Sequence, residues 1–343
     1  MGFRLISHGA TDVGLKRQKN EDYFAILEEE ELYILADGMG GHASGQVASR
    51  LATEHIVEFM TERCRQPGFQ WPYPVAEGAS FEEAAISNAI QFANERTFIE
   101  SMKDSRLEGM GTTVCAIVGA GDRLVLAHVG DSRIYRYRAG TVEQVTRDHS
   151  LLNHYLDTGT ITPEEVKDFK NKNVIIRAVG LKDYVDPEVQ VTEKRPGDVY
   201  LICSDGLSDL VEPWIMKNTF EDEGDDLPAV AQRLIRLANQ GGGKDNITVV
   251  LVQIAGDGSE EEVTDPLGIP AQRDDRPTYS ETEPAPEVEP EPEQTVPGMA
   301  VGVHSPVVAM PTDRLSIDSE APTPRNGIPA ARPEEPPPPR RRR

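Results

Sequence analysis

Short apolar runs, many alternating with polar residues, recur along the chain from Phe3 to Ile254. Most follow one another closely. EDYFAIL and LYILAD are separated only by an acidic turn, and TTVCAIVGA, DRLVLAHVG and SRIYRYRAG are joined by turns that contain Gly or Asp. Two further runs, DVYLICSD and ITVVLVQI, stand later in the chain. Strands joined by tight turns pair antiparallel, so the pattern predicts an antiparallel β-sheet core.

Three other segments have the spacing of amphipathic helices, and we expect helices over 45–64, 81–102 and 226–239. In each, apolar residues recur every three or four positions, which places them on one face of a helix. The third segment ends at three consecutive glycines, which stop a helix. Separate helices beside strands that pair among themselves predict an α+β domain, with the helices packed outside the sheet core.

The pattern weakens in two places. The segment 147–177 contains two short helical pieces and is interpreted as an inserted flap. The segment 256–343 holds 18 of the 26 prolines and one aromatic residue, Tyr279, so it lacks the apolar mass that offsets the entropy cost of ordering. We therefore expect one folded domain over 1–255, followed by a disordered tail, rich in proline and acidic residues, that ends in four arginines.

Charge and cysteine content exclude several classes of function. The formal net charge of −23 repels phosphate backbones and anionic lipids, so neither a nucleic acid nor a membrane is expected as a partner. The longest apolar run, Ile247–Ile254, is far shorter than a membrane span of about 20 residues. The N-terminal residues lack the pattern of a secretion signal, and the three cysteines form no CxxC pair. We expect a cytoplasmic protein.

The residues with the clearest chemical meaning are carboxylates at strand ends, each beside a glycine or an amide-rich turn. Asp37 and Asp205 both follow strongly apolar strands and both precede a glycine. Taken singly, such residues are typical of ordinary turns. Several of them in one cleft would repel one another unless cations neutralise them, and oxygen ligands without cysteine or paired histidine favour Mg²⁺ or Mn²⁺ over Zn²⁺. The glycine after Asp37 also allows the Gly38 carbonyl to approach such an ion.

Eight segments, in this order and at these spacings, carry a resemblance. They are TDVGLKRQKNEDYF, LADGMGGHASGQVAS, GMGTTVCAI, AHVGDSRIYRY, DHSLLNHYL, NVIIRAVG, LICSDGLSD and GGKDNITVVLV. Between about residues 3 and 254 the chain resembles the metal-dependent type-2C Ser/Thr protein phosphatases, most of all their bacterial members. The resemblance implies a central antiparallel β-sandwich flanked by helices on both faces, in α-β-β-α layers, with a flap.

The same resemblance implies a binuclear metal site. Asp37 is similar to the carboxylate that bridges two metal ions, and the Gly38 carbonyl to a ligand of one of them. Asp205 and Asp245 are similar to the terminal ligands of the other ion. The implied cofactor is Mn²⁺ or Mg²⁺, as two ions with a third, weaker one in bacterial members.

Further acidic residues have implied roles in the same site. Glu21 and Asp22 resemble the acidic pair that holds water at the metals. Asp131 resembles a ligand of the third ion, shared with Asp205, and either Asn173 or Asp209 is a candidate to complete that third site.

Arg17 matches the family's phosphate-binding arginine, a role that suits a guanidinium fork. His42 is a candidate general acid for the leaving alkoxide, or else a residue that borders the following helix, because three residues separate it from the Asp-Gly pair. The other histidines have no spacing that suggests zinc, and we interpret them as core-edge or flap residues. They include His8, His55, His128, His149 and His154.

The implied function is hydrolysis of phosphoserine and phosphothreonine in proteins, opposing Ser/Thr kinases, with a water molecule activated by two metal ions. The implied partners are phosphorylated proteins and a cognate Ser/Thr kinase, and the tail is a candidate docking arm. Two alternatives remain open. One is a catalytically inactive scaffold or signalling module of the same family, and the other is a two-metal hydrolase of nucleotides or small phosphoesters.

Overall fold

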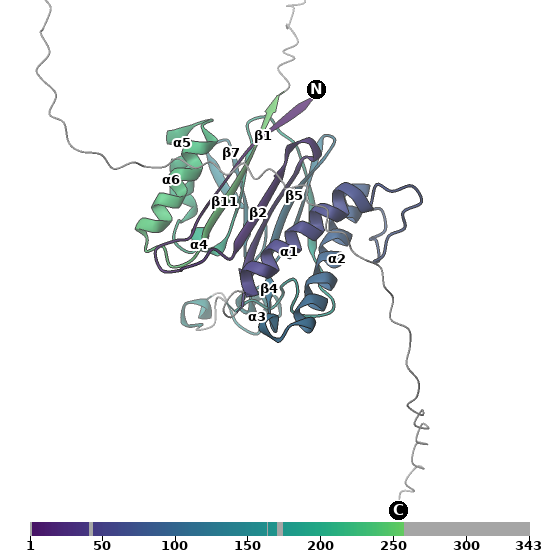
Figure 1. The fold of residues 1–343 in the computed structure, drawn as a ribbon. Coiled ribbons are helices and arrows are strands. Elements are labelled where there is room, and N and C mark those ends of the chain that lie inside the picture. Colours follow the sequence, from purple (N-terminus) through teal and green to yellow (C-terminus); the bar gives the residue numbers. More distant parts are fainter. Residues whose placement is uncertain (1, 41–43, 163, 170–173, 257–343) are drawn as a thin grey trace, which may run out of the picture. The chain divides into compact units, whose positions relative to one another are not determined.

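The computed structural model describes residues 2–40, 44–162, 164–169 and 174–256, which form two antiparallel sheets and the helices around them (Figure 1). One sheet has the order β1-β11-β10-β7-β8 and the other the order β2-β3-β5-β6-β9, with β4 also paired to β3. The first sheet consists of β1 (Phe3–Asp12), β11 (Ile247–Gly256), β10 (Val199–Cys203), β7 (Arg133–Arg138) and β8 (Thr141–Gln144). The second consists of β2 (Asp22–Leu27), β3 (Leu32–Met39), β4 (Gly111–Thr112), β5 (Val114–Ala120), β6 (Arg123–Val129) and β9 (Glu188–Glu193).

Helices cover the outer face of each sheet, α1 and α2 on one side and α5 and α6 on the other (Figure 1). The α-helices are α1 (Ser44–Glu58), α2 (Phe81–Lys103), α3 (Leu151–Asp157), α4 (Asp205–Ser208), α5 (Pro213–Glu223) and α6 (Leu227–Gln240). A π-helical turn, η2 (Phe59–Arg63), extends α1, and 3-10 turns are η1 (Glu28–Glu30), η3 (Ser105–Leu107) and η4 (Glu165–Asp168). The predicted layered α+β sandwich is confirmed.

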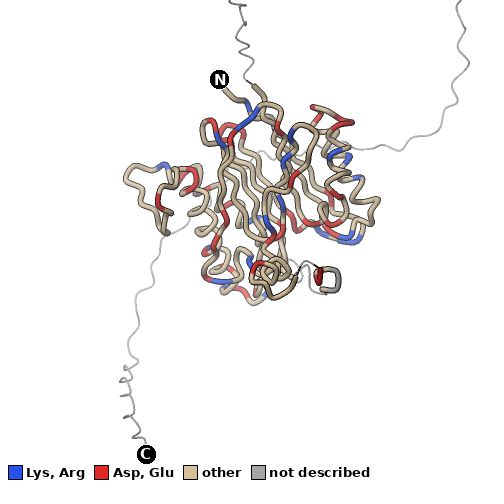
Figure 2. Tube along the Cα trace, turned by 180° about the vertical axis from the view of Figure 1, so that it is seen from behind, with Lys and Arg blue, Asp and Glu red and all other residues tan. Residues whose placement is uncertain are grey.

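Three apolar clusters fill the spaces between these layers. In β3, Leu32 and Ile34 face α1 and α2, while Tyr33 and Leu35 face the other sheet. Because side chains alternate along a strand, a strand buried on both faces is largely apolar, as are β10 and most of β3 and β11. The central sheets are largely free of charged residues, which gather toward their edges and the helices (Figure 2). The apolar layers therefore hold the strands in fixed register.

The structure also contains strands and a helix that the sequence pattern did not predict. β1, β8 and β9 carry many polar residues, and β1 and β9 are edge strands whose pairing partners lie far away in sequence. Helix α5 begins with Pro213 in its first turn, a helix start signal, but its few buried residues give only a weak amphipathic pattern. Tertiary pairing and packing, which local patterns do not reveal, determine these elements.

The predicted flap is present as α3 and the 3-10 turn η4, and Ser150 bridges Ile175 at its base. The residues of the predicted tail beyond Gly256 lie outside the described residues, so its disorder and its docking role stay predictions. Among the described residues, no helix is both long enough and apolar enough to cross a membrane.

We expect Ile202→Ala to lower the free energy of unfolding by about 2–5 kcal/mol, because Ile202 is fully buried between the two sheets and its truncation leaves a cavity. Urea unfolding followed by circular dichroism measures the change. Met102→Ala is the control, since Met102 is 74% exposed, and we expect a change within about 0.5 kcal/mol. Equal effects of the two substitutions would contradict the assignment of Ile202 to the core.

Candidate active site

The carboxylates singled out from the sequence meet at one end of the sandwich. Asp22 and Asp37 stand directly opposite each other in the β2–β3 ladder. Asp205 begins α4 just after β10, and Asp245 lies two residues before β11. The pKa of Asp37 is raised well above its usual value by burial and then by the negative charges of Asp22, Asp205, Asp131 and Asp245. Five separate parts of the chain therefore bring acidic groups within electrostatic reach of one another.

Mutual repulsion acts throughout this cluster. Burial, followed by the charges of Asp131 and Asp245, raises the pKa of Asp205 to about 7. Burial and the charge of Asp148 raise the pKa of Asp131 to about 6. Asp131 and Asp205 are each only partly buried as residues. Divalent cations would relieve the repulsion and keep the groups ionised at neutral pH.

Asp22 is the most enclosed member of the cluster. Its Oδ2 atom accepts hydrogen bonds from Ser204 Oγ at 2.9 Å and Thr248 Oγ1 at 2.6 Å. Its Oδ1 atom is buried and has no hydrogen-bond partner among the described residues. Burial raises the pKa of Asp22 to about 6, although the two hydroxyl groups oppose that shift. A rigidly held carboxylate with one unsatisfied oxygen fits a site that binds a cation or its water.

Close backbone approach brings the Gly38 carbonyl beside Glu21. The Gly38 amide donates to the Glu21 carbonyl at 3.1 Å. A Cβ atom on Gly45, in the first turn of α1, would lie 2.9 Å from both the Gly38 carbonyl oxygen and the Glu21 carboxyl carbon. Only glycine fits at this position without displacing one of them. The Gly38 carbonyl and the Glu21 carboxylate thus both lie beside Gly45, and burial and then the charge of Asp245 raise the pKa of Glu21.

Asn246 organises the loop that leads into β2, a role that the sequence did not reveal. Its Oδ1 atom accepts from the Glu21 amide at 2.8 Å, and its Nδ2 atom donates to the carbonyls of Val13 and Lys19 at 3.0 and 2.9 Å. Its own amide donates to Asp245 Oδ1 at 2.8 Å. One buried amide thus joins Glu21 to Asp245. The only signal was its position beside Asp245, which does not distinguish an organising amide from a turn residue.

The backbone of Asp37 is fixed by the Gly-Thr-Thr segment around β4. The Asp37 amide donates to Thr113 Oγ1 at 3.1 Å, and the Asp37 carbonyl accepts from the Thr113 amide at 2.8 Å and from Thr112 Oγ1 at 2.9 Å. Thr113 Oγ1 also shares a 2.7 Å hydrogen bond with Ser132 Oγ, next to Asp131. These bonds hold the end of β3 relative to the turn that carries Asp131.

Arg17 lies at the cluster and pairs with one of its acids. Its Nη2 atom donates to Asp245 Oδ2 at 2.6 Å. The side chain of Arg17 is 48% exposed, so it has room to move. Phosphate binding by Arg17 and metal binding by Asp245 would compete with this ion pair.

Asp131 is a member of the cluster that also interacts with the flap base, since burial and then the charge of Asp148 raise its pKa. Asp209 contributes to the raised pKa of both Asp131 and Asp205, so it is close to the predicted third site. Burial and then the Asp148 charge raise the pKa of Asp209 itself, against the opposing charge of Arg133. His42 and Asn173 lie outside the described residues.

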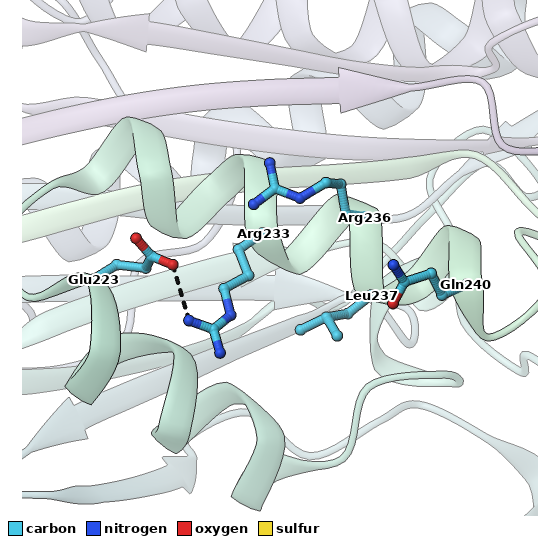
Figure 3. A pocket seen from close by; sticks show the side chains of 5 residues that line it. All are labelled: Glu223, Arg233, Arg236, Leu237 and Gln240. Carbon is cyan, nitrogen blue, oxygen red and sulfur yellow. Dashed lines mark hydrogen bonds and ion pairs between the residues drawn. The ribbon is translucent and has the colours of Figure 1, made fainter. Parts of the chain in front are cut away.

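Two hollows occur away from the carboxylates. One, of 320 Å³, lies between α5 and α6 and is lined by Glu223, Arg233, Arg236, Leu237 and Gln240 (Figure 3). Arg233 is held there by Glu223 at 2.9 Å and Asp222 at 2.7 Å, so its charge serves to join the two helices. The other, of 440 Å³, lies beside η2 and α2, with Phe59, Phe69 and Phe92 in its lining. Neither hollow contains a member of the acidic cluster.

The chain is similar in sequence to bacterial phosphatases. A family model described as protein phosphatase 2C matches residues 15–251. The serine/threonine protein phosphatase PstP of Mycobacterium tuberculosis is 38% identical over 247 residues, which cover 71% of this chain and 44% of that protein. The chain thus spans less than half the length of this relative. The serine/threonine phosphatase stp of Listeria welshimeri is 35% identical over 247 residues, which cover 71% of this chain and 93% of that protein.

Solved structures show the same similarity in three dimensions. The catalytic domain of PstP in complex with two manganese ions has a TM-score of 0.61 at 37% identity, covering 74% of this chain and 100% of that one. The phosphatase Stp1 of Staphylococcus aureus has a TM-score of 0.64 at 33% identity, covering 75% of this chain and 97% of that one.

The raised pKa values predict how pH affects stability. Asp205 and Asp131 titrate near 7 and 6 in the folded chain, against about 4 in an unfolded one, so the folded state binds more protons. Without metal, the contribution of these two groups to stability is full below about pH 4 and is lost as pH rises through about 6 and 7. Mn²⁺ should therefore stabilise the chain more at about pH 8 than at about pH 5, by at least about 2 kcal/mol. Urea unfolding with Mn²⁺ or with a chelator measures this difference.

Asp205→Asn is the matched variant, because it removes one repelling charge while keeping the shape of the side chain. We expect it to reduce the pH dependence seen with the chelator. An equal Mn²⁺ effect at both pH values in the unsubstituted chain would contradict the electrostatic account of the cluster.

Proposed function

The chain belongs to the protein phosphatase 2C family, and we propose that it hydrolyses phosphoserine and phosphothreonine in proteins with the help of two Mn²⁺ or Mg²⁺ ions. The family resemblance predicted from the sequence motifs is thereby confirmed. The observation that carries the proposal is the convergence of acidic groups from separate elements at one end of the sandwich, with pKa values raised by burial and by their mutual repulsion.

The residues fit such a pair of ions. We assign Asp37 as the carboxylate shared by both, the Gly38 carbonyl as a ligand of one, and Asp205 and Asp245 as ligands of the other. The unsatisfied, buried Oδ1 atom of Asp22 and the hard oxygen character of the set support this assignment. The solved structure of the PstP catalytic domain with two manganese ions supports the number and the kind of ion. When bound, the ions lower the pKa of water and offset the charge of the phosphate.

The chain's own groups orient the reactants. Asp22, held by Ser204 and Thr248, and Glu21, whose backbone is held by Asn246, provide acceptors that align a water molecule for attack on phosphorus. Arg17 presents two N–H groups that match two phosphate oxygens, and its charge opposes the negative charge that develops as the bond to the leaving oxygen breaks. His42 remains our candidate donor of the proton that the leaving alkoxide takes up.

We extend the proposal to a third, weaker ion at Asp131 and Asp205, with Asp209 beside them. The raised pKa of all three groups supports a further cation there. We also propose that the domain opposes a cognate Ser/Thr kinase in the cytoplasm. The three free, buried cysteines are consistent with a reducing compartment.

We expect Asp37→Asn to reduce hydrolysis of a phosphothreonine peptide by on the order of 100-fold or more, because it weakens the ligand shared by both ions. The assay compares release of inorganic phosphate with Mn²⁺ and with excess chelator, and calorimetry compares Mn²⁺ binding. Asp122→Asn is the control, since Asp122 is an 85% exposed turn residue.

Normal turnover by Asp37→Asn, or by the unsubstituted chain after complete chelation, would contradict the proposed function. A folded chain that binds Mn²⁺ but hydrolyses neither phosphopeptides nor p-nitrophenyl phosphate would instead favour the inactive scaffold. A preference for nucleotides or small phosphoesters would favour the other two-metal hydrolase.

Arg17→Ala should raise KM for the phosphopeptide by about 10- to 100-fold and change kcat less, because the bidentate contact with phosphate is lost. Arg17→Lys keeps the charge without the fork, and we expect it to recover only part of the affinity. Steady-state kinetics at saturating Mn²⁺ measure both parameters. Unchanged KM in Arg17→Ala would exclude Arg17 from phosphate binding.

A further inference from the structure

Two adjacent residues at the base of the flap hold both flanks of Asp131. On one side, Arg133 donates from Nε and Nη2 to the Asp148 carboxylate, at 2.9 Å to Oδ1 and 2.7 Å to Oδ2. On the other side, the His149 amide donates to the Gly130 carbonyl at 2.8 Å, and the Gly130 amide donates to His149 Nδ1 at 3.1 Å. Residues 148 and 149 thus clamp the short turn that carries Asp131.

The backbone of the turn at Gly130 has little room to move. Gly130 has a φ of 109°, a backbone conformation that favours glycine, and a Cβ atom there would lie 2.6 Å from Thr113 Cγ2. Thr113 in turn accepts the hydrogen bond from the Asp37 amide. A shift of Gly130 would therefore disturb Asp131 first, and Asp37 through Thr113.

The His149 ring is itself held on several sides. It stacks on the His128 ring with 4.5 Å between centroids and an interplanar angle of 16°. His128 is fully buried, and its Nε2–H donates to the Arg147 carbonyl at 2.9 Å. Both rings are thereby fixed against the strand β6 and the first residues of the flap.

The hydrogen-bond partners determine which nitrogen of His149 carries the proton. The Gly130 amide is a fixed, buried donor, so Nδ1 accepts and Nε2 is protonated, facing Glu188 Oε2 at 3.5 Å. Arg177 Nη1 lies 3.2 Å from Nε2 and also donates to the Asp186 carbonyl at 3.0 Å. A protonated Nε2 beside a guanidinium cannot bind a metal ion, although His128, His149 and Glu188 lie close enough together to suggest one. Burial, the neighbouring His128 and Arg177 lower the pKa of His149 to about 3, so the ring stays a neutral acceptor at neutral pH.

His149 also lies where the two ends of the flap meet. Its carbonyl accepts from the Ile176 amide at 2.9 Å, and the next residue, Ser150, pairs with Ile175. The Leu151 amide donates to the Val174 carbonyl at 2.8 Å. The position of the flap base and the position of the Asp131 turn are therefore set by the same residue.

We propose that His149 is a positioning residue for Asp131, acting through the hydrogen bond from the Gly130 amide to Nδ1 and linking the flap base to the weaker metal site. The inference rests on the proposed function, in which Asp131 is a ligand of the third ion. Nothing in it requires His149 to touch substrate or metal.

Two substitutions of His149, made in the full 343-residue chain, distinguish the contribution of the Nδ1 hydrogen-bond acceptor from that of the aromatic ring. His149→Phe keeps an aromatic ring to stack on His128 but leaves the buried Gly130 amide without a partner. His149→Asn loses the ring but places an amide oxygen near the position of Nδ1. The control is His154→Phe, an exposed histidine in α3. Kinetics with a phosphothreonine peptide across Mn²⁺ concentrations are measured beside Mn²⁺ calorimetry and thermal unfolding.

We expect His149→Phe to lower kcat by about tenfold, with a smaller change in KM, and to weaken the lowest-affinity Mn²⁺ binding step by a similar factor, because an unsatisfied buried donor displaces the turn. His149→Asn should stay within about twofold of the unsubstituted chain in both readouts, even if it unfolds at a lower temperature. His154→Phe should change neither. In a double-mutant cycle, His149→Phe should add little to the loss caused by Asp131→Ala.

The proposal is overturned if His149→Phe matches the unsubstituted chain in rate and Mn²⁺ binding. It is also overturned if rates follow thermal stability, so that the less stable of the two variants is the less active, or if the effects of His149→Phe and Asp131→Ala are additive. If the unsubstituted chain shows no metal-dependent hydrolysis, the proposed function fails, while the calorimetric comparison of Mn²⁺ binding still tests the role of His149.

Discussion

Repulsion among carboxylates held at one end of a β-sandwich is the constraint on which the rest of this structure depends. Asp37 is surrounded by the charges of Asp22, Asp205, Asp131 and Asp245, and burial together with neighbouring negative charges raises the pKa values of Asp37, Asp205 and Asp131. A protein gains nothing in stability from such an arrangement. The arrangement of carboxylates is explained if their charges bind cations. The bound ions then supply the chemistry that the side chains lack.

The scaffold keeps the acids together against that repulsion. The β2–β3 register places Asp22 opposite Asp37, and a slip of β2 by one residue would turn Asp22 to the opposite face of the sheet from Asp37. Apolar clusters on both faces of each central strand oppose such a slip. Around the site, Asn246, Ser204 and the Thr112–Thr113 pair fix the acids or their backbone by hydrogen bonds. Rigid strands and satisfied polar groups thus maintain a cluster that would otherwise spread apart.

The sequence predicted those parts of the molecule that local chemistry determines. Paired apolar runs gave the central strands, helical spacing gave α1, α2 and α6, and the strand-end acids gave the members of the cluster. The strand β1 is rich in polar residues, and its own pattern does not predict a strand. It is extended because it pairs with β11, which lies at the other end of the domain in sequence. Asn246 and Ser204 were missed for a similar reason. Their contacts join residues far apart in sequence, and no spacing rule identifies an asparagine or serine as an organiser of a distant carboxylate.

The most direct test of the account is a crystal structure of the chain grown with Mn²⁺, with anomalous scattering measured near the manganese absorption edge. The account predicts two strong anomalous peaks among Asp37, the Gly38 carbonyl, Asp205 and Asp245, with Arg17 released from Asp245. Peaks elsewhere, such as between His128, His149 and Glu188, with none at the acidic cluster, would contradict it.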